Sequence, residues 1–350
     1  MTIPARTPAF RWGLIGPGKI AGQFAGALKV VENSNLHAIA GRNGPRSEAF
    51  ARCHGVPLCY DNHSELLNDP DIDAVYIATP HRFHFELARD CLLAGKPVLC
   101  EKPLAVNMHE ARELIELSRR HGVFLMEGLW TRFLPIYDEV NQWLVAGKIG
   151  EVTSITSTFG FTFPRKLDDR LLNPDLAGGA LLDLGVYNLA MSQWVFGTQP
   201  VSHSIDGQLG ETGVDEHSAV SLMYSGGRCS KFEISMIKQL DNDLVIQGSG
   251  GYIRVDAMFW SATRATLVQR GTSNSALFST SITRELRGNG LEYEIEAAQR
   301  CIKEGSIECS TMSHAHTLET MKLMDALRQD IGLSYDFEHS GMGQVLSEES

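Results

Sequence analysis

The sequence predicts an α/β protein in which a doubly wound parallel sheet precedes a second part built on an antiparallel sheet. Strand-like and helix-like segments alternate through the first third of the chain, as they do in parallel sheets. A glycine-rich turn joins the first strand to the first helix. After about Gly150, short strands rich in Thr, Ser and Val follow one another, which is typical of an antiparallel sheet.

The first strand, Arg11-Trp12-Gly13-Leu14-Ile15, leads into Gly16-Pro17-Gly18-Lys19-Ile20-Ala21 and then into a helical pattern. The first glycine allows a tight turn, the second lets the backbone approach a pyrophosphate, and the small Ala21 lets the helix pack on the strand. Phosphates would lie at the helix N-terminus, where amide groups and the helix dipole favour anions. An ordinary glycine turn is the alternative. We expect NAD or NADP to bind at Gly16, Pro17, Gly18, Lys19 and Ile20.

The end of the second predicted strand, residues 35–41, favours NADP over NAD. In NAD-binding proteins an acidic residue roughly 20 residues past the fingerprint holds the ribose. This chain has Gly41-Arg42-Asn43 there instead. Arginine can stack on adenine and pair with a 2′-phosphate, although a solvated loop arginine is the alternative for Arg42. Arg46 and Lys19 would add positive charge if they lie nearby.

Further elements of the first part follow from local patterns. Asn107 followed by Glu110 resembles a capping box that starts a helix, which Gly122 ends. Ligands of a doubly wound sheet bind at the carboxyl ends of its strands. We expect strands at 74–78, 97–100 and 123–126, and helices at 85–93 and 107–122.

The second part continues with strands interrupted by one helix and closed by two more. The chain has no internal repeat and no low-complexity linker. We therefore expect an NAD(P)-binding domain at 8–128 and a substrate-binding and dimerisation domain at 129–340. Within the latter we expect strands at 151–161, 218–224, 231–237, 244–247 and 265–269, and helices at 179–196, 291–304 and 314–329.

Composition excludes several classes of protein. The chain has 350 residues, of which 43% are hydrophobic, so it can bury a large core. Its net charge of −11 and pI near 5.6 argue against a nucleic-acid surface. No run approaches the about 20 apolar residues of a membrane span, and no signal peptide is recognisable. Seven cysteines without a Cys-x-x-Cys pair suit reduced thiols, so we expect a cytoplasmic protein.

Glu101-Lys102-Pro103 follows a predicted parallel strand and so lies at the expected cofactor edge. A partly desolvated ammonium can hold a hydroxyl or a substrate oxygen by its charge. An ordinary lysine at a strand end is the alternative. A proline at a tight strand exit also predicts a cis bond between Lys102 and Pro103.

The segment from Gly178-Gly179 through Asp183 to Tyr187 enters the helix predicted at 179–196. Asp183 and Tyr187 are four residues apart, which places them on one face of a regular helix. A glycine pair permits close backbone approach to a ligand. If Lys102 lies beside Tyr187, its ammonium stabilises the phenolate, and the tyrosine can donate and accept a proton. Capping and packing are the alternative roles.

Four motifs in this order resemble the Gfo/Idh/MocA oxidoreductase family, named for glucose-fructose oxidoreductase and inositol dehydrogenase. They are Gly16-x-Gly18-x-x-Ala21, Ala78-Thr79-Pro80 with His84, Glu101-Lys102-Pro103, and Gly178-Gly179 through Asp183 to Tyr187. The resemblance covers nearly the whole chain. It implies a Rossmann domain followed by an α/β domain with a large open, mostly antiparallel sheet. That sheet often mediates dimers in the family, so a homodimer or higher homo-oligomer is expected.

Within the family the chain resembles the dimeric dihydrodiol dehydrogenases and NADP-dependent D-xylose dehydrogenases. Tyr187 stands where many relatives have histidine, and Arg42 matches the subgroup's NADP preference. Residues 126–135 resemble the subgroup's stretch beneath the nicotinamide. The resemblance implies hydride transfer between nicotinamide C4 and a cyclic polyol, an aldose or a trans-dihydrodiol.

The resemblance also implies roles for individual residues. Tyr187 would be the general acid and base, Lys102 would bind the reacting oxygen, and Asp183 would orient the substrate or Lys102. For His84 a helix start and for Glu101 a hydrogen bond that holds the loop are the alternatives. The implied cofactor contacts, besides the glycine loop and Arg42, are Thr79, Pro80, His84, Glu101, Lys102, Trp130 and Arg132.

Three other functions stay open. One is a different dehydrogenase of the family, for an inositol, an aminosugar or a sugar, including an enzyme that keeps NADP bound between half-reactions. Another is a non-catalytic NADP-binding sensor, which would not need Lys102 and Tyr187. A third is metal-dependent hydrolysis, prompted by His81 with His84 and His314 with His316. Neither histidine pair has a carboxylate at ligand spacing within a glycine-rich strand context that would suit zinc, so no metal is expected.

Overall fold

The computed structural model describes residues 9–340 except 165, 168, 198 and 271–276. Contacts divide the described chain into two compact units. One takes the described residues of Met1–Ala105, His109–Trp130 and Leu286–Thr317, and the other takes those of Val106–Met108, Thr131–Glu285 and Leu318–Ser350. Each unit therefore joins segments that lie far apart in the sequence. The domain boundary between residues 128 and 129 stays a prediction.

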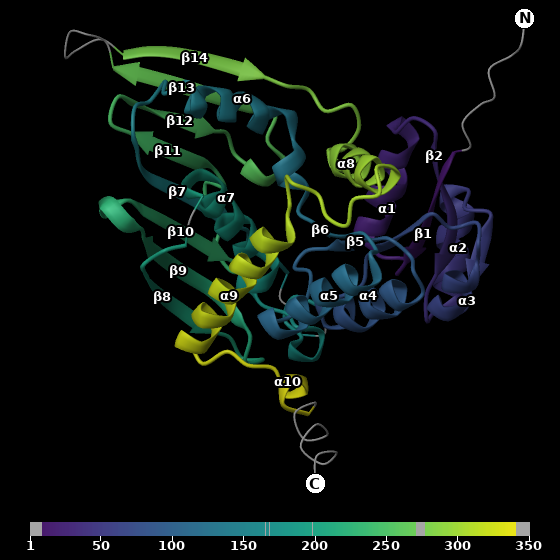
Figure 1. The fold of residues 1–350 in the computed structure, drawn as a ribbon. Helices are drawn as coiled ribbons and strands as arrows, with labels where there is room; N and C mark the ends of the chain where they lie inside the picture. The colour runs from purple at the N-terminus through teal and green to yellow at the C-terminus, as the bar shows by residue number, and fades with distance from the viewer. Residues whose placement is uncertain (1–8, 165, 168, 198, 271–276, 341–350) are drawn as a thin grey trace, which may run out of the picture. The chain divides into compact units, whose positions relative to one another are not determined.

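The first unit is built on a six-stranded parallel sheet (Figure 1). The strand order is β3-β2-β1-β4-β5-β6, and every neighbouring pair is parallel. This is the order of dinucleotide-binding doubly wound sheets, whose ligands lie where the order reverses, here between β1 and β4. The predicted doubly wound sheet is confirmed. Its strands are β1 (Phe10–Ile15), β2 (Ser34–Ala40), β3 (Leu58–Tyr60), β4 (Ala74–Ile77), β5 (Val98–Glu101) and β6 (Leu125–Gly128).

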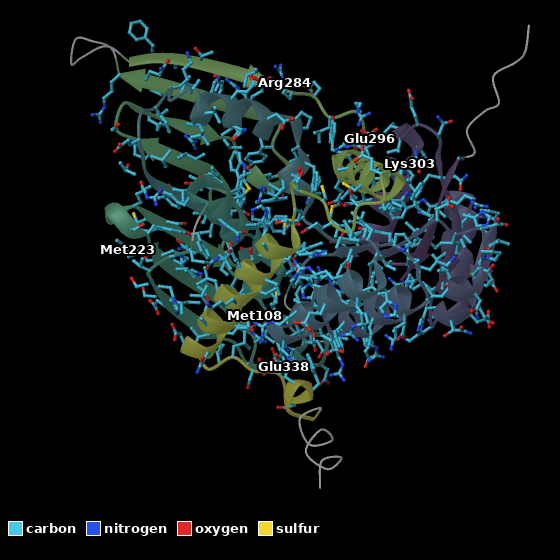
Figure 2. The ribbon with its side chains drawn as sticks, viewed as in Figure 1. Met108, Met223, Arg284, Glu296, Lys303 and Glu338 are labelled. Carbon is cyan, nitrogen blue, oxygen red and sulfur yellow. The ribbon has the colours of Figure 1, made fainter. Side chains whose placement is uncertain are left out.

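Helices cover this sheet and complete its core. Trp12 of β1 meets the ring of Phe24 edge-on, and Phe24 stacks on Tyr76 of β4 with 3.8 Å between ring centroids. The last helix of the unit, α8, packs on α1 although more than 260 residues separate them in the chain. Glu296 and Lys303, labelled in Figure 2, lie on its outward side. The helices are α1 (Lys19–Ala27), α2 (Gly44–His54), α3 (His63–Asn68), α4 (His84–Leu93), α5 (Met108–His121) and α8 (Leu291–Lys303).

The second unit contains an eight-stranded sheet of order β14-β13-β12-β11-β7-β10-β9-β8 (Figure 1). All neighbours are antiparallel except β7 and β10. The predicted mostly antiparallel sheet is therefore confirmed. Its strands are β7 (Val152–Gly160), β8 (Ser202–Leu209), β9 (Asp215–Met223), β10 (Cys229–Ser235), β11 (Leu244–Gly248), β12 (Gly251–Val255), β13 (Arg264–Arg270) and β14 (Leu277–Thr283).

Helix α7 (Val186–Phe196) is almost entirely buried and packs on β7. Two of its buried polar side chains bond to the sheet: Asn188 donates to Ser157 Oγ at 2.7 Å, and the hydroxyls of Ser192 and Ser230 lie 2.6 Å apart. These bonds remove the cost of burying polar groups and fix the helix on the sheet. The unit also holds α6 (Pro135–Val145), most of α9 (His314–Asp330) and α10 (Asp336–Ser340).

A buried arginine ties α9 to α10. Arg328 Nη2 lies 2.9 Å from Glu338 Oε1, and Glu338 also accepts from Asn107 Nδ2 at 2.9 Å. Asp325 Oδ2 accepts from the amide of Met108 at 2.9 Å, and Figure 2 labels Met108 and Glu338. Asn107 and Met108 are thus anchored to α10 and α9.

Shorter turns complete the described structure. None of its helices combines the length and the apolar character that crossing a bilayer requires. Short 3₁₀ turns lie at Leu28–Val30, His81–Phe83, Trp130–Phe133, Pro174–Leu176, Ser225–Gly227 and Phe259–Ser261, and a π turn at Leu181–Gly185.

Candidate active site

The glycine loop lies against the loop that follows β4. Gly16 has φ +100°, and a Cβ on it would lie 2.9 Å from Thr79 Cγ2 and 3.0 Å from the carbonyl oxygen of Ala78. Only glycine fits this approach. Gly18 precedes α1 and has no side chain to cap the amides that open the helix. The predicted loop therefore has the backbone geometry of a phosphate site.

Arg42 follows β2 and is exposed. Its guanidinium carbon lies 4.3 Å from the ring centroid of Phe83, a cation–π contact that orients the side chain. Asn43 caps α2 by accepting from the amide of Arg46 at 3.1 Å. The arginine is thus held just beyond the end of β2.

The structure confirms the predicted cis peptide bond between Lys102 and Pro103. Glu101, the last residue of β5, is buried and accepts a hydrogen bond from the hydroxyl of Tyr76. Burial and the neighbouring Glu101 carboxylate raise the pKa of Tyr76. This bond supports the interpretation of Glu101 as a residue that holds the loop.

His84 is fully buried at the start of α4. Its Nδ1 lies 2.8 Å from the carbonyl oxygen of Pro103, and its Nε2 lies 2.9 Å from that of Thr79. Burial lowers the pKa of His84 to about 4, and the two carbonyl contacts oppose this shift. Both ring nitrogens face backbone, so His84 has no nitrogen to offer a metal ion.

Glu127 lies within the stretch 126–135, but the sequence did not single it out. It lies in β6 and is 2% exposed. Oε1 accepts from the amide of Leu104 at 3.0 Å, and Oε2 accepts from the hydroxyl of Thr317 at 2.8 Å. The sequence feature that could have identified Glu127 is a carboxylate within an otherwise apolar strand.

Several buried polar side-chain atoms have no hydrogen-bond partner among the described residues. The hydroxyl of Thr79 and Nη1 of Arg132 are two of them, and others lie elsewhere in both units, such as Ser47 Oγ and Asp215 Oδ1. Burial also lowers the pKa of Arg132 to about 10. Buried polar atoms are normally paired, so the atoms of Thr79 and Arg132 could each take a polar group of a ligand. Trp130 begins the 3₁₀ turn that carries Arg132.

The glycine pair of the second unit is required by packing within the protein. Gly179 has φ +125°, and a Cβ on it would lie 2.3 Å from Asp215 Oδ1. A Cβ on Gly178 would lie 2.6 Å from the carbonyl oxygen of Leu171. The sequence suggested close approach to a ligand, whereas the structure shows close approach to an aspartate and a loop.

Asp183 and Tyr187 do not share the regular helix that the sequence predicted. Asp183 lies in the π turn, and Tyr187 lies in the first turn of α7. Both are 7% exposed, and Arg170 donates to Asp183 Oδ1 at 3.1 Å. A π turn has more residues per turn than an α-helix, so two residues four apart no longer lie on the same face as they would in a regular helix. Such turns often occur at functional sites.

An aromatic cluster adjoins Tyr187. Phe159 of β7 lies 5.5 Å from the Tyr187 ring, centroid to centroid, and stacks on Trp260 at 3.6 Å with 3° between the planes. Phe161 meets Trp260 edge-on at 5.7 Å. The sequence did not single out these residues, because about 100 positions separate Phe159 from Trp260.

Lys102 belongs to the first unit, and Asp183 and Tyr187 belong to the second. Within the first unit the structure brings together the exits of β1, β4 and β5, with Gly16, Thr79 and His84. Within the second it brings Tyr187 to the aromatic cluster. The joint action of Lys102 and Tyr187 is a proposal.

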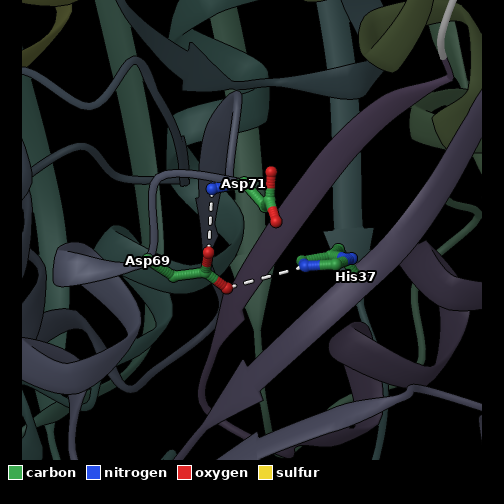
Figure 3. A group of neighbouring side chains, drawn as sticks. All are labelled: His37, Asp69 and Asp71. Carbon is green, nitrogen blue, oxygen red and sulfur yellow. Dashed lines mark hydrogen bonds and ion pairs between the residues drawn. The ribbon is translucent and has the colours of Figure 1, made fainter.

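A second polar group lies within the first unit (Figure 3). His37, Asp69 and Asp71 have potential ligand atoms within 4.8 Å of one another. Asp69 Oδ1 accepts from the amide of Asp71 at 2.8 Å and Oδ2 from the hydroxyl of Tyr60 at 3.0 Å, and Arg11 pairs with Asp71. These carboxylates already have protein partners, which supports a structural role.

Comparison with known sequences identifies both parts of the chain. The profile of the oxidoreductase family with an NAD-binding Rossmann fold matches residues 10–129, and that of the GFO/IDH/MocA C-terminal domain matches residues 137–254. The trans-1,2-dihydrobenzene-1,2-diol dehydrogenase of Xenopus laevis is 35% identical over 333 residues, covering 93% of this chain and 99% of that protein. The enzyme of the same name from Danio rerio is 35% identical over 330 residues, covering 93% and 98%.

Solved structures agree with the fold. A crystal structure of a 3-ketoreductase from Actinomadura kijaniata in complex with NADP and TDP-benzene has a TM-score of 0.81 and 25% identity, covering 92% of this chain and 98% of that one. The aldose-aldose oxidoreductase from Caulobacter crescentus has a TM-score of 0.82 and 21% identity, covering 92% and 97%, a likeness of fold. The glycine loop, the Rossmann strand order and both family profiles lead to one conclusion: the chain belongs to the Gfo/Idh/MocA oxidoreductase family and is an NAD(P)-binding dehydrogenase.

Proposed function

We propose that the protein is an NADP-dependent dehydrogenase that transfers hydride between nicotinamide C4 and a cyclic polyol, an aldose or a trans-dihydrodiol. The observation that carries this proposal is the place of Lys102. It follows β5 at the carboxyl edge of the sheet, and the loop that holds it is bonded through His84 to the loop that packs on Gly16. A cation is thereby fixed at the edge where a dinucleotide binds.

The residues present fit the cofactor. The opening amides of α1 with Gly16, Pro17, Gly18, Lys19 and Ile20 would hold the pyrophosphate, and Arg42 on Phe83 would hold the 2′-phosphate. Thr79 and Arg132 have buried donors for further polar groups, with Pro80 and Trp130 beside them in the chain. Bound NADP supplies or accepts the hydride. The NADP in the 3-ketoreductase structure supports this choice over NAD.

Proton transfer is assigned to Tyr187. Its hydroxyl would take the proton when a hydroxyl is oxidised and return it when a carbonyl is reduced. The Lys102 ammonium would stabilise the phenolate and the developing charge on the substrate oxygen. Asp183, held by Arg170, would orient the substrate or Lys102.

The substrate class rests on the aromatic cluster and the relatives. Phe159, Phe161 and Trp260 give Tyr187 a flat apolar neighbourhood that suits the ring of a dihydrodiol or the carbon face of a sugar. The relatives of 35% identity are named trans-1,2-dihydrobenzene-1,2-diol dehydrogenases. We also propose a cytoplasmic location and domains that divide at residue 128, as the sequence predicts.

The test follows NADPH fluorescence with a panel of trans-dihydrobenzenediol, D-xylose, D-glucose and cyclic polyols. Wild type is expected to turn over at least one ring diol or sugar. Lys102→Met and Tyr187→Phe should each lower kcat about 100-fold or more while NADP still binds. Arg52→Met, an exposed change on α2, is the control and should keep wild-type turnover. Unchanged kcat in Tyr187→Phe would remove it as acid and base, and tight NADP binding without any turnover would favour a sensor.

A further inference from the structure

The peptide group between Pro103 and Leu104 has both of its polar atoms bound by buried side chains. Its carbonyl oxygen lies 2.8 Å from His84 Nδ1, and its amide donates to Glu127 Oε1 at 3.0 Å. His84 is fully buried and Glu127 is 2% exposed. A planar peptide bound at both ends cannot rotate without leaving a buried group unpaired. The backbone next to Lys102 is therefore fixed in orientation.

Each of the two side chains also has a second anchor. His84 Nε2 lies 2.9 Å from the carbonyl oxygen of Thr79, so the imidazole joins the exits of β4 and β5. Glu127 Oε2 accepts from the hydroxyl of Thr317 at 2.8 Å, so the carboxylate joins the exit of β5 to β6 and to the start of α9. Neither side chain can shift without breaking two buried contacts.

Both residues are also electrostatically coupled to Lys102. Burial raises the pKa of Glu127, and the Lys102 ammonium acts in the opposite direction. Burial lowers the pKa of His84 to about 4, and the neighbouring His81 and Lys102 act in the same direction. Hydrogen bonds to both carbonyls need a proton on each ring nitrogen, and burial, His81 and the Lys102 ammonium oppose that second proton. Lys102 in turn favours the ionised form of Glu127.

We propose that His84 and Glu127 are positioning residues that set the place of the Lys102 ammonium by clamping the Pro103–Leu104 peptide group. They act through this peptide and do not touch the substrate. The inference deepens the proposed function and rests on the catalytic role given there to Lys102. The family resemblance implied a cofactor contact for His84, and its two bonds show that it also links two loops.

Substitutions at position 84 can separate the two bonds of the imidazole. Asparagine places its amide nitrogen near the position of Nδ1, so His84→Asn keeps a donor toward Pro103. Glutamine reaches the position of Nε2, so His84→Gln keeps only the bond toward Thr79. We expect kcat to fall about 10- to 100-fold in His84→Gln and to recover most of that loss in His84→Asn. The Kd of NADP should stay within about threefold of wild type in both.

Position 127 offers a similar pair. Glu127→Gln keeps an acceptor for the amide of Leu104, and Glu127→Ala removes it. Glu127→Ala should lower kcat about 10- to 100-fold with little change in the Kd of NADP, and Glu127→Gln should restore most of the turnover. The control is His314→Ala, because His314 is also buried and bonds a backbone carbonyl, that of Leu125 at the opposite end of β6. It should lower stability without lowering kcat of the folded enzyme.

A readout without substrate separates this inference from the proposed function. Lysines labelled as ¹³C-dimethyl derivatives give NMR signals, and the signal missing in Lys102→Met belongs to Lys102. That signal should shift in His84→Gln and Glu127→Ala and stay in place in His314→Ala, whether or not a substrate is known. An unmoved signal in both folded variants, or an equal loss of kcat in His314→Ala, would overturn the clamp. A shifted signal in an enzyme inert toward every substrate supports the clamp while the proposed function fails.

Discussion

At the scale of single residues, the buried polar groups of the candidate site are of two kinds, those paired within the protein and those without a partner. Most of those described above are paired: Glu101 with Tyr76, Glu127 with Thr317, and Asn188 with Ser157. Thr79 and Arg132 are among the described residues with an unpartnered buried polar atom, and both belong to stretches that the family resemblance assigned to the cofactor; Ser47 Oγ and Asp215 Oδ1 are examples outside those stretches. Unpaired buried groups cost stability, so a site that keeps them gains from binding.

Arg42 permits a sharp test of cofactor choice at this scale. Arg42→Ala should raise the KM for NADP about tenfold or more and change the KM for NAD less than about twofold, because only NADP has a 2′-phosphate. Arg46→Ala, at a second exposed arginine four residues along, is the control and should change either KM less. Steady-state kinetics with both cofactors measure this. Equal increases for NAD and NADP would remove Arg42 from the 2′-phosphate.

At the scale of elements, a strand fixes the start of the helix that carries Tyr187. Asp215 of β9 is fully buried, and its Oδ2 accepts from the amide of Leu181 at 2.7 Å. Asp215 thereby satisfies the amide that opens the π turn, as an N-cap residue does for a helix, but from a different element of the chain. Burial raises the pKa of Asp215 to about 7. In an unfolded chain an aspartate has a pKa of about 3.9.

This difference makes stability depend on pH. Between about pH 4 and pH 7 the folded state holds a proton on Asp215 that the unfolded state has lost, so the free energy of unfolding falls as pH rises. The slope is at most about 1.4 kcal/mol per pH unit. Asp215→Asn cannot lose a proton, so its stability relative to wild type should rise across this range and level off above pH 7. Urea unfolding from pH 4 to 8 measures this, with the exposed Asp206→Asn as control. A constant difference between Asp215→Asn and wild type would contradict the shift.

At the scale of the whole molecule, the eight-stranded sheet leaves part of one face exposed. Thr156, Ala219 and Lys231 lie on neighbouring strands and are exposed, whereas Ser157 and Phe232 on the other face are buried. An exposed sheet face is often covered by a second subunit, and a two-fold partner is the commonest arrangement. We propose a homodimer through this face.

Light scattering tests the dimer. Wild type should have about twice the chain mass of 38.5 kDa, and Thr156→Arg, which places a long charged side chain on the central strand of the face, should give the mass of one chain. Gln142→Arg adds the same charge at an exposed position on α6 and should leave the mass doubled. A doubled mass in Thr156→Arg would move the interface elsewhere.

Local sequence patterns predicted the features that depend only on residues close together in the chain. Gly16 to Ala21 predicted the phosphate loop, and Lys102-Pro103 predicted the cis bond. The strands β3, β8, β12 and β14 and the helices α2, α3, α6 and α10 were not predicted. The clamp at Glu127 and the stack of Phe159 on Trp260 join residues far apart in sequence, and no local pattern records such contacts. The π turn depends on Asp215, which lies on another element.

The packing of α8 on α1 has a consequence for the making of this protein. A ribosome releases α1 early and α8 only after more than 290 residues have been joined. Until then, α1 lacks the helix that packs on it in the finished fold, and the first unit is incomplete although all six of its strands have been made. The nascent chain must therefore stay soluble through most of translation, which is the period when chaperones have most reason to bind it.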